Sequence, residues 1–272
     1  MDYGFVLPGG TAAQQLPLAE LAEASGWDGI FVWETGWGVD AWTLLGAMAA
    51  RTTQIRLGTM LTPLPWRRPW KVAGSVATVD QLSGGRVILA VGLGAVDTGL
   101  GDFGEATGVN ARASILDDSI DLMRALWAGQ VTYSGPHFKY SLPADGGPGA
   151  AAKPVQERVP IWCVGAWPRP KSMQRILRCD GLIPQVSLGW QATPPEITEM
   201  LDWLRSRGGA GPGFDFITEG QTEPGPESAA KVETLAQAGA TWWLETRWEL
   251  GGRSEDDLQK VRERIAAGPP RH

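Results

Sequence analysis

The chain is organised around residues 56–94, which read RLGTMLTPLPWRRPWKVAGSVATVDQLSGGRVILAVGLG. Residues 55–61 alternate apolar and small side chains before the turn Thr62-Pro63-Leu64-Pro65, which predicts a strand that ends abruptly. Pro69 suits a first helical turn, and apolar residues then recur at helical spacing as far as a pair of glycines. Residues 87–91 form a continuous apolar run, typical of a strand covered on both faces. The stretch therefore predicts one strand–helix–strand unit.

The same alternation continues from one end of the chain to the other. Short apolar runs predict strands over residues 3–7, 30–33, 55–61, 87–91, 160–164, 182–185, 214–218 and 241–244. Amphipathic segments predict helices over residues 15–25, 41–51, 69–83, 111–128, 170–178, 194–207, 226–238 and 255–266. A small hairpin is expected over residues 131–140. The alternation predicts an α/β fold, a (β/α)8 TIM barrel forming a single domain over residues 1–272.

Composition and charge exclude several classes of protein. Hydrophobic residues make up 43% of the 272 residues, which is enough for a large core. The net charge of −6 and the pI near 5.1 argue against a nucleic-acid partner, because such proteins gather Lys and Arg on one face. No apolar run is long enough to span a bilayer, and no basic segment precedes the first strand. We therefore expect a cytoplasmic protein without a membrane or nucleic-acid partner.

The two cysteines, Cys163 and Cys179, do not indicate a metal site. Their spacing matches no CxxC motif, and only His137 and His272 could join them as imidazole ligands. Nor does a pair of cysteines in a chain of this length suggest a disulfide framework. We expect both cysteines to be reduced and buried, and we expect no bound metal.

Barrel enzymes carry their chemistry on the loops that follow the strands, at the carboxyl ends of the strands. Candidate functional residues are therefore those that end the predicted strands: Glu34, Thr62, Gly92, Gly165, Gln185, Glu219 and Glu245. The fifth strand is followed by a group suited to a phosphate: backbone N–H donors near Gly165, the cations Arg169 and Lys171, and the Ser172 hydroxyl. Two prolines in this segment remove potential donors, which is unusual for such a site.

Other charged residues have ordinary structural explanations. Asp97 and Glu219 are expected to be solvated loop charges. Arg86 begins a strand on the face of the barrel that serves stability, so a structural role is expected for it. Arg112 and Asp118 are expected to form a pair on a helix surface rather than to take part in chemistry.

Several motifs carry a family resemblance. They are Leu57-Gly58-Thr59, the helix start at Pro69, the segment 77–86 (ATVDQLSGGR) and Val91-Gly92-Leu93-Gly94, supported by the pattern in residues 103–138. Over nearly its whole length, the chain resembles the bacterial luciferase-like oxidoreductases, which depend on a flavin or a deazaflavin. The resemblance implies that FMN, or alternatively the deazaflavin F420, lies across the carboxyl ends of the strands. Its terminal phosphate would lie near Arg169, Lys171 and Ser172.

The resemblance also implies roles for two backbone segments. Thr62 and Pro63 would form a bulge behind the cofactor ring, where some members of the family have a non-proline cis peptide bond. Gly92 and Gly94 would approach the cofactor closely, as residues without a side chain can. We expect these two segments to lie side by side at the face of the barrel that binds the cofactor.

The chain departs from the family pattern at the end of the second strand. Many members have a histidine directly after the acidic residue there, whereas Glu34 is followed by Thr35-Gly36-Trp37. His137 belongs to a helix-to-strand connection, expected on the opposite face of the barrel, and is a poor replacement. An acid or base would then be Glu34 or Glu245, although Glu245 could simply pair with Arg247; otherwise the cofactor performs the chemistry alone.

The expected activity is hydride transfer or oxygen insertion on a small organic substrate by a flavin-dependent oxidoreductase or monooxygenase. Expected partners are that substrate, a separate flavin reductase if oxygen is used, and a second copy of the chain in a homodimer. Two alternatives stay open at this stage. One is a flavin-binding barrel without catalysis, and the other is a cofactor-free hydrolase that uses two carboxylates such as Glu34 and Glu245.

Overall fold

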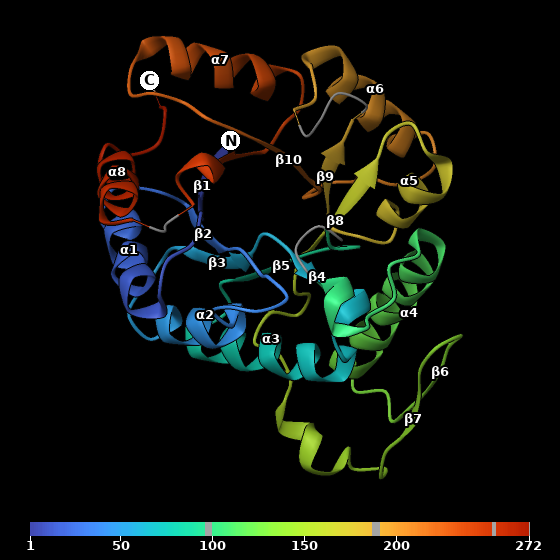
Figure 1. Ribbon diagram of the computed structural model, residues 1–272. Coiled ribbons are helices and arrows are strands. Elements are labelled where there is room, and N and C mark those ends of the chain that lie inside the picture. The colour runs from blue at the N-terminus through green and yellow to red at the C-terminus, as the bar shows by residue number, and fades with distance from the viewer. Residues whose placement is uncertain (96–99, 187–190, 252–253, 272) are drawn as a thin grey trace.

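The computed structural model describes residues 1–95, 100–186, 191–251 and 254–271, and these residues form a closed barrel of parallel strands (Figure 1). The strands are β1 (Asp2–Leu7), β2 (Gly29–Val32), β3 (Arg56–Thr59), β4 (Thr62–Pro63), β5 (Val87–Gly92), β8 (Ile161–Ala166), β9 (Gly181–Gln185), β10 (Asp215–Gly220) and β11 (Trp242–Glu245). Their order is β3-β2-β1-β11-β10-β9-β8-β5-β4, and the pairing of β3 with β5 closes the ring. The predicted (β/α)8 TIM barrel is confirmed.

Helices form an outer ring around the barrel (Figure 1). They are α1 (Ala12–Ala24), α2 (Ala41–Ala49), α3 (Pro69–Ser83), α4 (Val109–Trp127), α5 (Pro170–Ile176), α6 (Pro194–Arg205), α7 (Pro226–Gln237) and α8 (Glu255–Ala266). Short 3-10 helices are η1 (Leu64–Trp66), η3 (Leu100–Phe103), η4 (Gly147–Ala151) and η5 (Trp248–Leu250). The predicted hairpin is present as β6 (Thr132–Ser134) and β7 (Lys139–Ser141), which extends outside the ring of helices (Figure 1). Every predicted helix is present, with its ends displaced by a few residues at most.

The third barrel strand is interrupted, which the sequence did not predict. Both β3 and β4 pair with β5, in the registers Leu57↔Val87 and Thr62↔Val91. Between them the chain passes through a cis peptide bond that joins Met60 to Leu61. The expected continuous strand over residues 55–61 therefore ends at Thr59, and parallel pairing with β5 resumes at Thr62 with the register shifted by one residue.

The core has two layers, separated by the wall of strands. Inside the barrel, alternate residues of the strands form one cluster: Val6, Phe31, Met60, Ile88, Ala90, Trp162, Ile183, Ile217, Trp242 and Leu244. Phe31 stacks on Trp162 with ring centroids 5.4 Å apart, and Trp162 contacts Trp242 edge-on at 5.1 Å. A second, larger cluster lies between the strands and the helices. A residue's place in the alternation thus decides whether its side chain faces the barrel interior or the helices.

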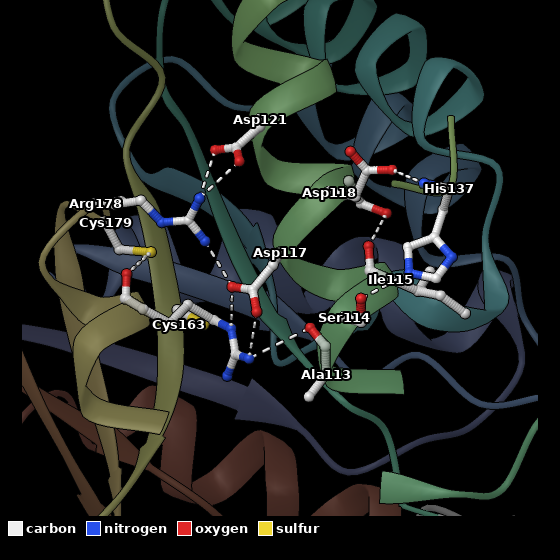
Figure 2. Close-up of polar contacts among 12 residues, drawn as sticks. Ala113, Ser114, Ile115, Asp117, Asp118, Asp121, His137, Cys163, Arg178 and Cys179 are labelled. Atoms are coloured by element: carbon white, nitrogen blue, oxygen red, sulfur yellow. Dashed lines mark hydrogen bonds and ion pairs between the residues drawn. The ribbon is translucent and has the colours of Figure 1, made fainter. Parts of the chain in front are cut away.

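Two residues of α4 correct an expectation from the sequence. Arg112 and Asp118 do not form a surface pair, because both are buried. Asp118 accepts hydrogen bonds from the backbone N–H groups of His137 and Phe138 and so ties the β6–β7 hairpin to α4 (Figure 2). The His137 ring lies 2.7 Å from the Ser114 hydroxyl of the same helix. The hairpin covers Asp118 and the segment after β5 contacts Arg112, and the pattern of α4 alone reveals neither.

Other structural expectations are confirmed. Arg86 is buried and donates to several carbonyls near the amino ends of the strands, including Ile55 O at 2.6 Å and Thr52 O at 2.8 Å. Cys163 and Cys179 are free and buried. Arg175 of α5 and Arg178 in the turn that follows it both bind Asp117 of α4, at 2.8 and 2.6 Å, which fixes α5 against α4. Figure 2 shows Arg178 between Asp117 and Asp121.

The described residues contain neither a membrane-spanning helix nor a cluster of metal-binding side chains. None of the helices there is long and apolar enough to cross a membrane. Across residues 1–95, 100–186, 191–251 and 254–271, no group of three or more His, Cys, Asp or Glu side chains could hold a metal ion.

Candidate active site

The mouth of the barrel lies at the carboxyl ends of the strands, and its floor is apolar. Leu61 and Val164 pack on the inner cluster yet stay partly exposed, so they form the uppermost layer of the interior. A methyl group at Gly92 would lie 2.9 Å from Leu61 Cδ2 and 3.2 Å from Val164 Cγ2. A larger residue at position 92 would therefore displace both side chains from the floor.

The two predicted cofactor segments are neighbours, as expected. Thr62 pairs with Val91, and Pro63 pairs with Gly92, in parallel register. The cis peptide bond between Met60 and Leu61 directly precedes this pair, one step before the predicted bulge. The structure thus brings Thr62, Pro63 and Gly92 together at the carboxyl ends of β4 and β5.

Gly94 ends this segment in a backbone conformation that favours glycine. Its φ is 77°, and a Cβ atom there would fall 2.0 Å from a ring carbon of Trp66. Arg112 donates to the carbonyls of Leu93 and Gly94, at 3.0 and 2.7 Å, and holds the end of β5 in place. Asp97, which was expected to be a solvated charge, lies outside the described residues.

Glu34 stands behind the mouth rather than in it. Residues 30 and 32 of β2 face the helices, and Glu34 continues that alternation. Its carboxylate accepts a hydrogen bond from Thr62 Oγ1 at 2.8 Å and lies 2.8 Å from Arg67 Nε. Burial raises the pKa of Glu34, and the nearby Arg67 opposes that rise. Glu34 therefore braces Thr62 from the helix side of the strand.

Glu245 is also on the helix side, and it is fully enclosed. Its side chain is 0% exposed and lies 3.3 Å from both Arg247 and Arg264. It accepts hydrogen bonds from Thr222, through the backbone N–H at 2.9 Å and the hydroxyl at 2.6 Å. Since β1 separates β2 from β11, Glu34 and Glu245 sit on different sections of the wall and do not converge on one space.

Glu219 is the carboxylate that faces the mouth, and the expectation that it is solvated is wrong. Two residues earlier, Ile217 belongs to the inner cluster, and the register partner of Glu219 on β11, Leu244, belongs to it as well. Glu219 Oε2 is buried and has no hydrogen-bond partner among the described residues. Burial raises the pKa of this carboxyl to about 7. Because β10 runs two residues further than predicted, Glu219 belongs to a strand instead of a loop.

The segment after β8 carries two exposed cations. Arg169 and Lys171 are exposed and have no ion pair with any residue that the structure describes. The Ser172 hydroxyl accepts a hydrogen bond from Ala166 N at 2.9 Å, which closes the turn that contains the cis bond before Pro168. Gly165 faces the helices, because a Cβ atom there would lie 2.5 Å from Leu182 Cδ1. Gly165 therefore serves packing within the wall, while the cations remain free.

Two tryptophans stand at the rim of the mouth. Trp33 directly follows β2, and Trp248 lies in η5 after β11. Their rings contact edge to face with centroids 6.1 Å apart, yet they remain 38% and 43% exposed. Exposed aromatic pairs of this kind offer apolar surface that a ligand can cover.

Comparison with known proteins agrees with the geometry. The family model of luciferase-like monooxygenases matches residues 4–267. A Mycobacterium tuberculosis protein, provisionally named a coenzyme F420-dependent oxidoreductase, is 33% identical over 61% of this chain and 49% of its own length. That alignment thus spans about half of the relative.

Solved structures of the same fold contain either kind of cofactor. An F420-dependent secondary alcohol dehydrogenase, solved with an F420-acetone adduct, has a TM-score of 0.73 at 18% identity, covering 98% of this chain and 99% of that one. The oxygenating constituent of a Pseudomonas putida Baeyer-Villiger monooxygenase, solved with FMN, has a TM-score of 0.65 at 16% identity, covering 99% and 80%. The family model matches almost the whole length of this chain. The chain therefore belongs to the luciferase-like monooxygenase family of oxidoreductases and monooxygenases.

Proposed function

We propose that this chain is an oxidoreductase that binds a flavin-type cofactor across the barrel mouth and transfers a hydride to or from a small organic substrate. The observation that carries the proposal is the apolar floor formed by Leu61 and Val164, which stays partly exposed at the carboxyl ends of the strands. A flat tricyclic ring would cover this floor, which lies at the end of the barrel where barrel enzymes bind their ligands.

The residues around the floor suit such a cofactor. Gly92 leaves room for Leu61 and Val164, and any larger residue there would disturb the surface beneath the ring. Arg169 and Lys171 are free to bind a phosphate group, with Ser172 holding the turn between them and β8. Trp33 and Trp248 would cover the open side of the ring and exclude water from it.

The deazaflavin F420 is the first candidate for the cofactor, and FMN is the second. The provisional name of the mycobacterial relative supports F420, and so does the alcohol dehydrogenase solved with an F420 adduct. The monooxygenase solved with FMN supports the second candidate. If FMN and oxygen are used, a separate flavin reductase would supply the reduced cofactor.

When bound, the cofactor supplies the centre that accepts or donates a hydride. The chain's own residues position it. Glu34 holds Thr62 by a hydrogen bond from behind, and Arg112 holds the carbonyls of Leu93 and Gly94. We assign Glu34 a positioning role and Glu245 a structural one, because the carboxylate of each is engaged on the helix side of the wall.

Separate titrations of the purified protein with F420 and FMN, followed by fluorescence, test the proposal. We expect F420 to bind at micromolar concentration and FMN at least about tenfold more weakly, a difference of about 1.4 kcal/mol. Leu61→Glu should weaken both by placing a charge on the floor. The matched control is Leu82→Glu, at an exposed leucine of α3, which should leave both affinities unchanged.

The outcomes separate the alternatives. If neither cofactor binds the unmodified protein at micromolar concentration, the proposal fails. If F420 binds but the bound cofactor is neither reduced nor oxidised by any substrate offered, the chain is a cofactor-binding barrel without catalysis. Consumption of oxygen with reduced FMN would identify a monooxygenase instead.

A further inference from the structure

We propose that Glu219 exchanges a proton with the substrate in the barrel mouth, and that the substrate is a small neutral alcohol or its carbonyl product. This inference rests on the proposed function, because it assigns the acid and base of the same site. The need for such a group is evident: no histidine follows Glu34, and both Glu34 and Glu245 are engaged behind the wall of strands.

The position of Glu219 is set by strand register. In β10, Ile217 pairs with Trp242 of β11, and Glu219 pairs with Leu244. Ile217, Trp242 and Leu244 all belong to the inner cluster. Glu219 is the next to last residue of β10, so its carboxyl group lies at the carboxyl end of the barrel, on the side where the cofactor would bind.

A second inward carboxylate on the same strand serves as an internal comparison. Asp215 lies at the opposite end of β10 and accepts hydrogen bonds from Trp162 Nε1 at 2.9 Å and from the Thr241 hydroxyl at 3.0 Å. Glu219 Oε2, four residues further on, is buried without any such donor among the described residues. One carboxylate is therefore satisfied by the protein, whereas the other has a buried oxygen without a hydrogen-bond donor among the described residues.

The surroundings of Glu219 contain no charge that would hold it in one protonation state. By strand alternation, the inward residues of the upper barrel are Val6, Phe31, Trp33, Met60, Leu61, Ala90, Gly92, Val164, Ala166, Ile183, Gln185, Leu244 and Thr246, and none is ionisable. The inward ionisable residues Asp2, Arg56 and Asp215 lie at the opposite, amino end of the strands, where they interact with one another. Burial alone raises the pKa of Glu219 to about 7. At neutral pH both forms are populated, which a proton donor and acceptor requires.

Glu219 alone can donate and accept the proton that the interconversion of alcohol and carbonyl requires. In the reductive direction, a bound reduced cofactor would supply the hydride for the new C–H bond at the carbonyl carbon, and the C=O π electrons would move to oxygen. That oxygen takes the proton of the Glu219 carboxyl, leaving a carboxylate. In the oxidative direction, the carboxylate removes the hydroxyl proton while the C–H hydride leaves to the oxidised cofactor.

The same features select the class of substrate. An anionic substrate would add a second negative charge beside a buried carboxyl that has no cation near it, which is unfavourable in an apolar mouth. A neutral molecule with one oxygen meets the carboxyl through a hydrogen bond and covers Leu61 and Val164 with its hydrocarbon part. Cyclohexanol and cyclohexanone are suitable probes, with hexanoate as the anionic counterpart.

Infrared spectroscopy of the cofactor-free protein tests the protonation of Glu219 directly. We expect a protonated-carboxyl stretching band that is lost as the pH rises through about 7 and is absent in Glu219→Gln. Glu227→Gln, at an exposed position on α7, is the matched control and should keep the band. If Glu219→Gln keeps the band, the buried carboxyl is not Glu219 and the inference fails without affecting the proposed function.

Turnover of cyclohexanone with reduced F420 tests the catalytic role. Glu219→Gln should lower kcat by at least about a hundredfold and remove the inflection in its pH profile, with the affinity for F420 changed by less than about threefold. Glu219→Asp should restore part of the rate, and Glu227→Gln should match the unmodified protein. Equal rates for Glu219→Gln and the unmodified protein would overturn the inference. So would turnover of hexanoate in preference to cyclohexanone, or F420 binding without turnover of either cyclohexyl probe. Failure of the unmodified protein to bind F420 would instead overturn the proposed function.

Discussion

Three glutamates at the carboxyl ends of strands have three different environments, and the difference follows from the side of the strand that each occupies. Glu34 and Glu245 face the helices, where Arg67 and Arg264 respectively approach them. Glu219 faces the upper interior, where burial alone acts on its pKa and no described cation pairs with it, since the inward Arg56 lies at the amino end with Asp215. Residue type and position at a strand end are therefore insufficient to identify an acid or base in a barrel, because alternation along the strand decides what the carboxyl group meets.

The elevated pKa of Glu219 has a consequence for stability. In the unfolded chain the carboxyl ionises near its ordinary pKa of 4.5, whereas in the folded protein it holds its proton up to a pKa of about 7. The unfolded state therefore loses its proton first as the pH rises. The free energy of unfolding should fall between about pH 4.5 and pH 7 and then level off, by at most about 3 kcal/mol.

Glu219→Gln should abolish this fall in the free energy of unfolding with rising pH. We expect the melting temperature of the variant, relative to the unmodified protein, to rise as the buffer is changed from pH 5 to pH 8 across that window. Thermal unfolding followed by circular dichroism at several pH values measures it. Glu227→Gln replaces an exposed carboxylate and should show no such trend. A constant difference at all pH values would mean that burial does not shift the pKa of Glu219.

Residues whose surroundings come from distant segments could not be predicted. Arg112 and Asp118 have the spacing of surface residues on an amphipathic helix, but the β5 loop and the hairpin bury them. Glu219 was assigned to a loop because the apolar run ends at Thr218, while the pairing with β11 extends the strand to Gly220. In contrast, Gly92 and the Thr62-Pro63 pair were placed correctly, since all of them lie in one local strand–helix–strand unit.

At the scale of single elements, the helices were predictable because their first residues are marked in the sequence. Proline occupies the first position of α3, α5, α6 and α7, where its missing N–H donor has no cost. Strand ends carry no comparable mark. The break between β3 and β4 depends on how the chain pairs with β5, which no local pattern reveals.

The connection between β8 and α5 is the element that we expect to bind the phosphate of the cofactor. Replacing Arg169 and Lys171 together with Ala should weaken FMN by at least about tenfold, because two charge-assisted contacts are lost. Riboflavin, which has the ring but no phosphate, should lose less than about threefold. Fluorescence titration of both ligands measures the difference.

The control variant for that experiment changes the net charge by the same amount at a different place on the surface. Lys139 and Lys153 are exposed cations near the hairpin, and replacing both with Ala also removes two positive charges. This variant should bind FMN as the unmodified protein does. Equal losses for FMN and riboflavin in the Arg169 and Lys171 variant would place the phosphate elsewhere on the mouth.

At the scale of the whole molecule, Glu245 joins parts of the chain that are far apart in sequence. It ends β11 and binds Thr222 after β10, Arg247 in the following loop and Arg264 in α8. The last helix therefore docks on the barrel through a buried charge cluster as well as through apolar contacts. The first and last strands of the chain meet at this place, where β1 pairs with β11 in the register Phe5↔Glu245.

Glu245→Gln should accordingly reduce stability and leave the chemistry intact. Arg264 is 5% exposed, and without the carboxylate its buried charge would be uncompensated, which should lower the free energy of unfolding by about 3 kcal/mol in urea titrations. Glu223→Gln breaks the ion pair between Glu223, whose side chain is 79% exposed, and Arg247. It should lower the free energy of unfolding by no more than about 0.5 kcal/mol. At low temperature, where Glu245→Gln is still folded, its affinity for F420 and its kcat should stay within about threefold of the unmodified protein. A folded Glu245→Gln protein with normal stability and no turnover would instead make Glu245 the catalytic carboxylate.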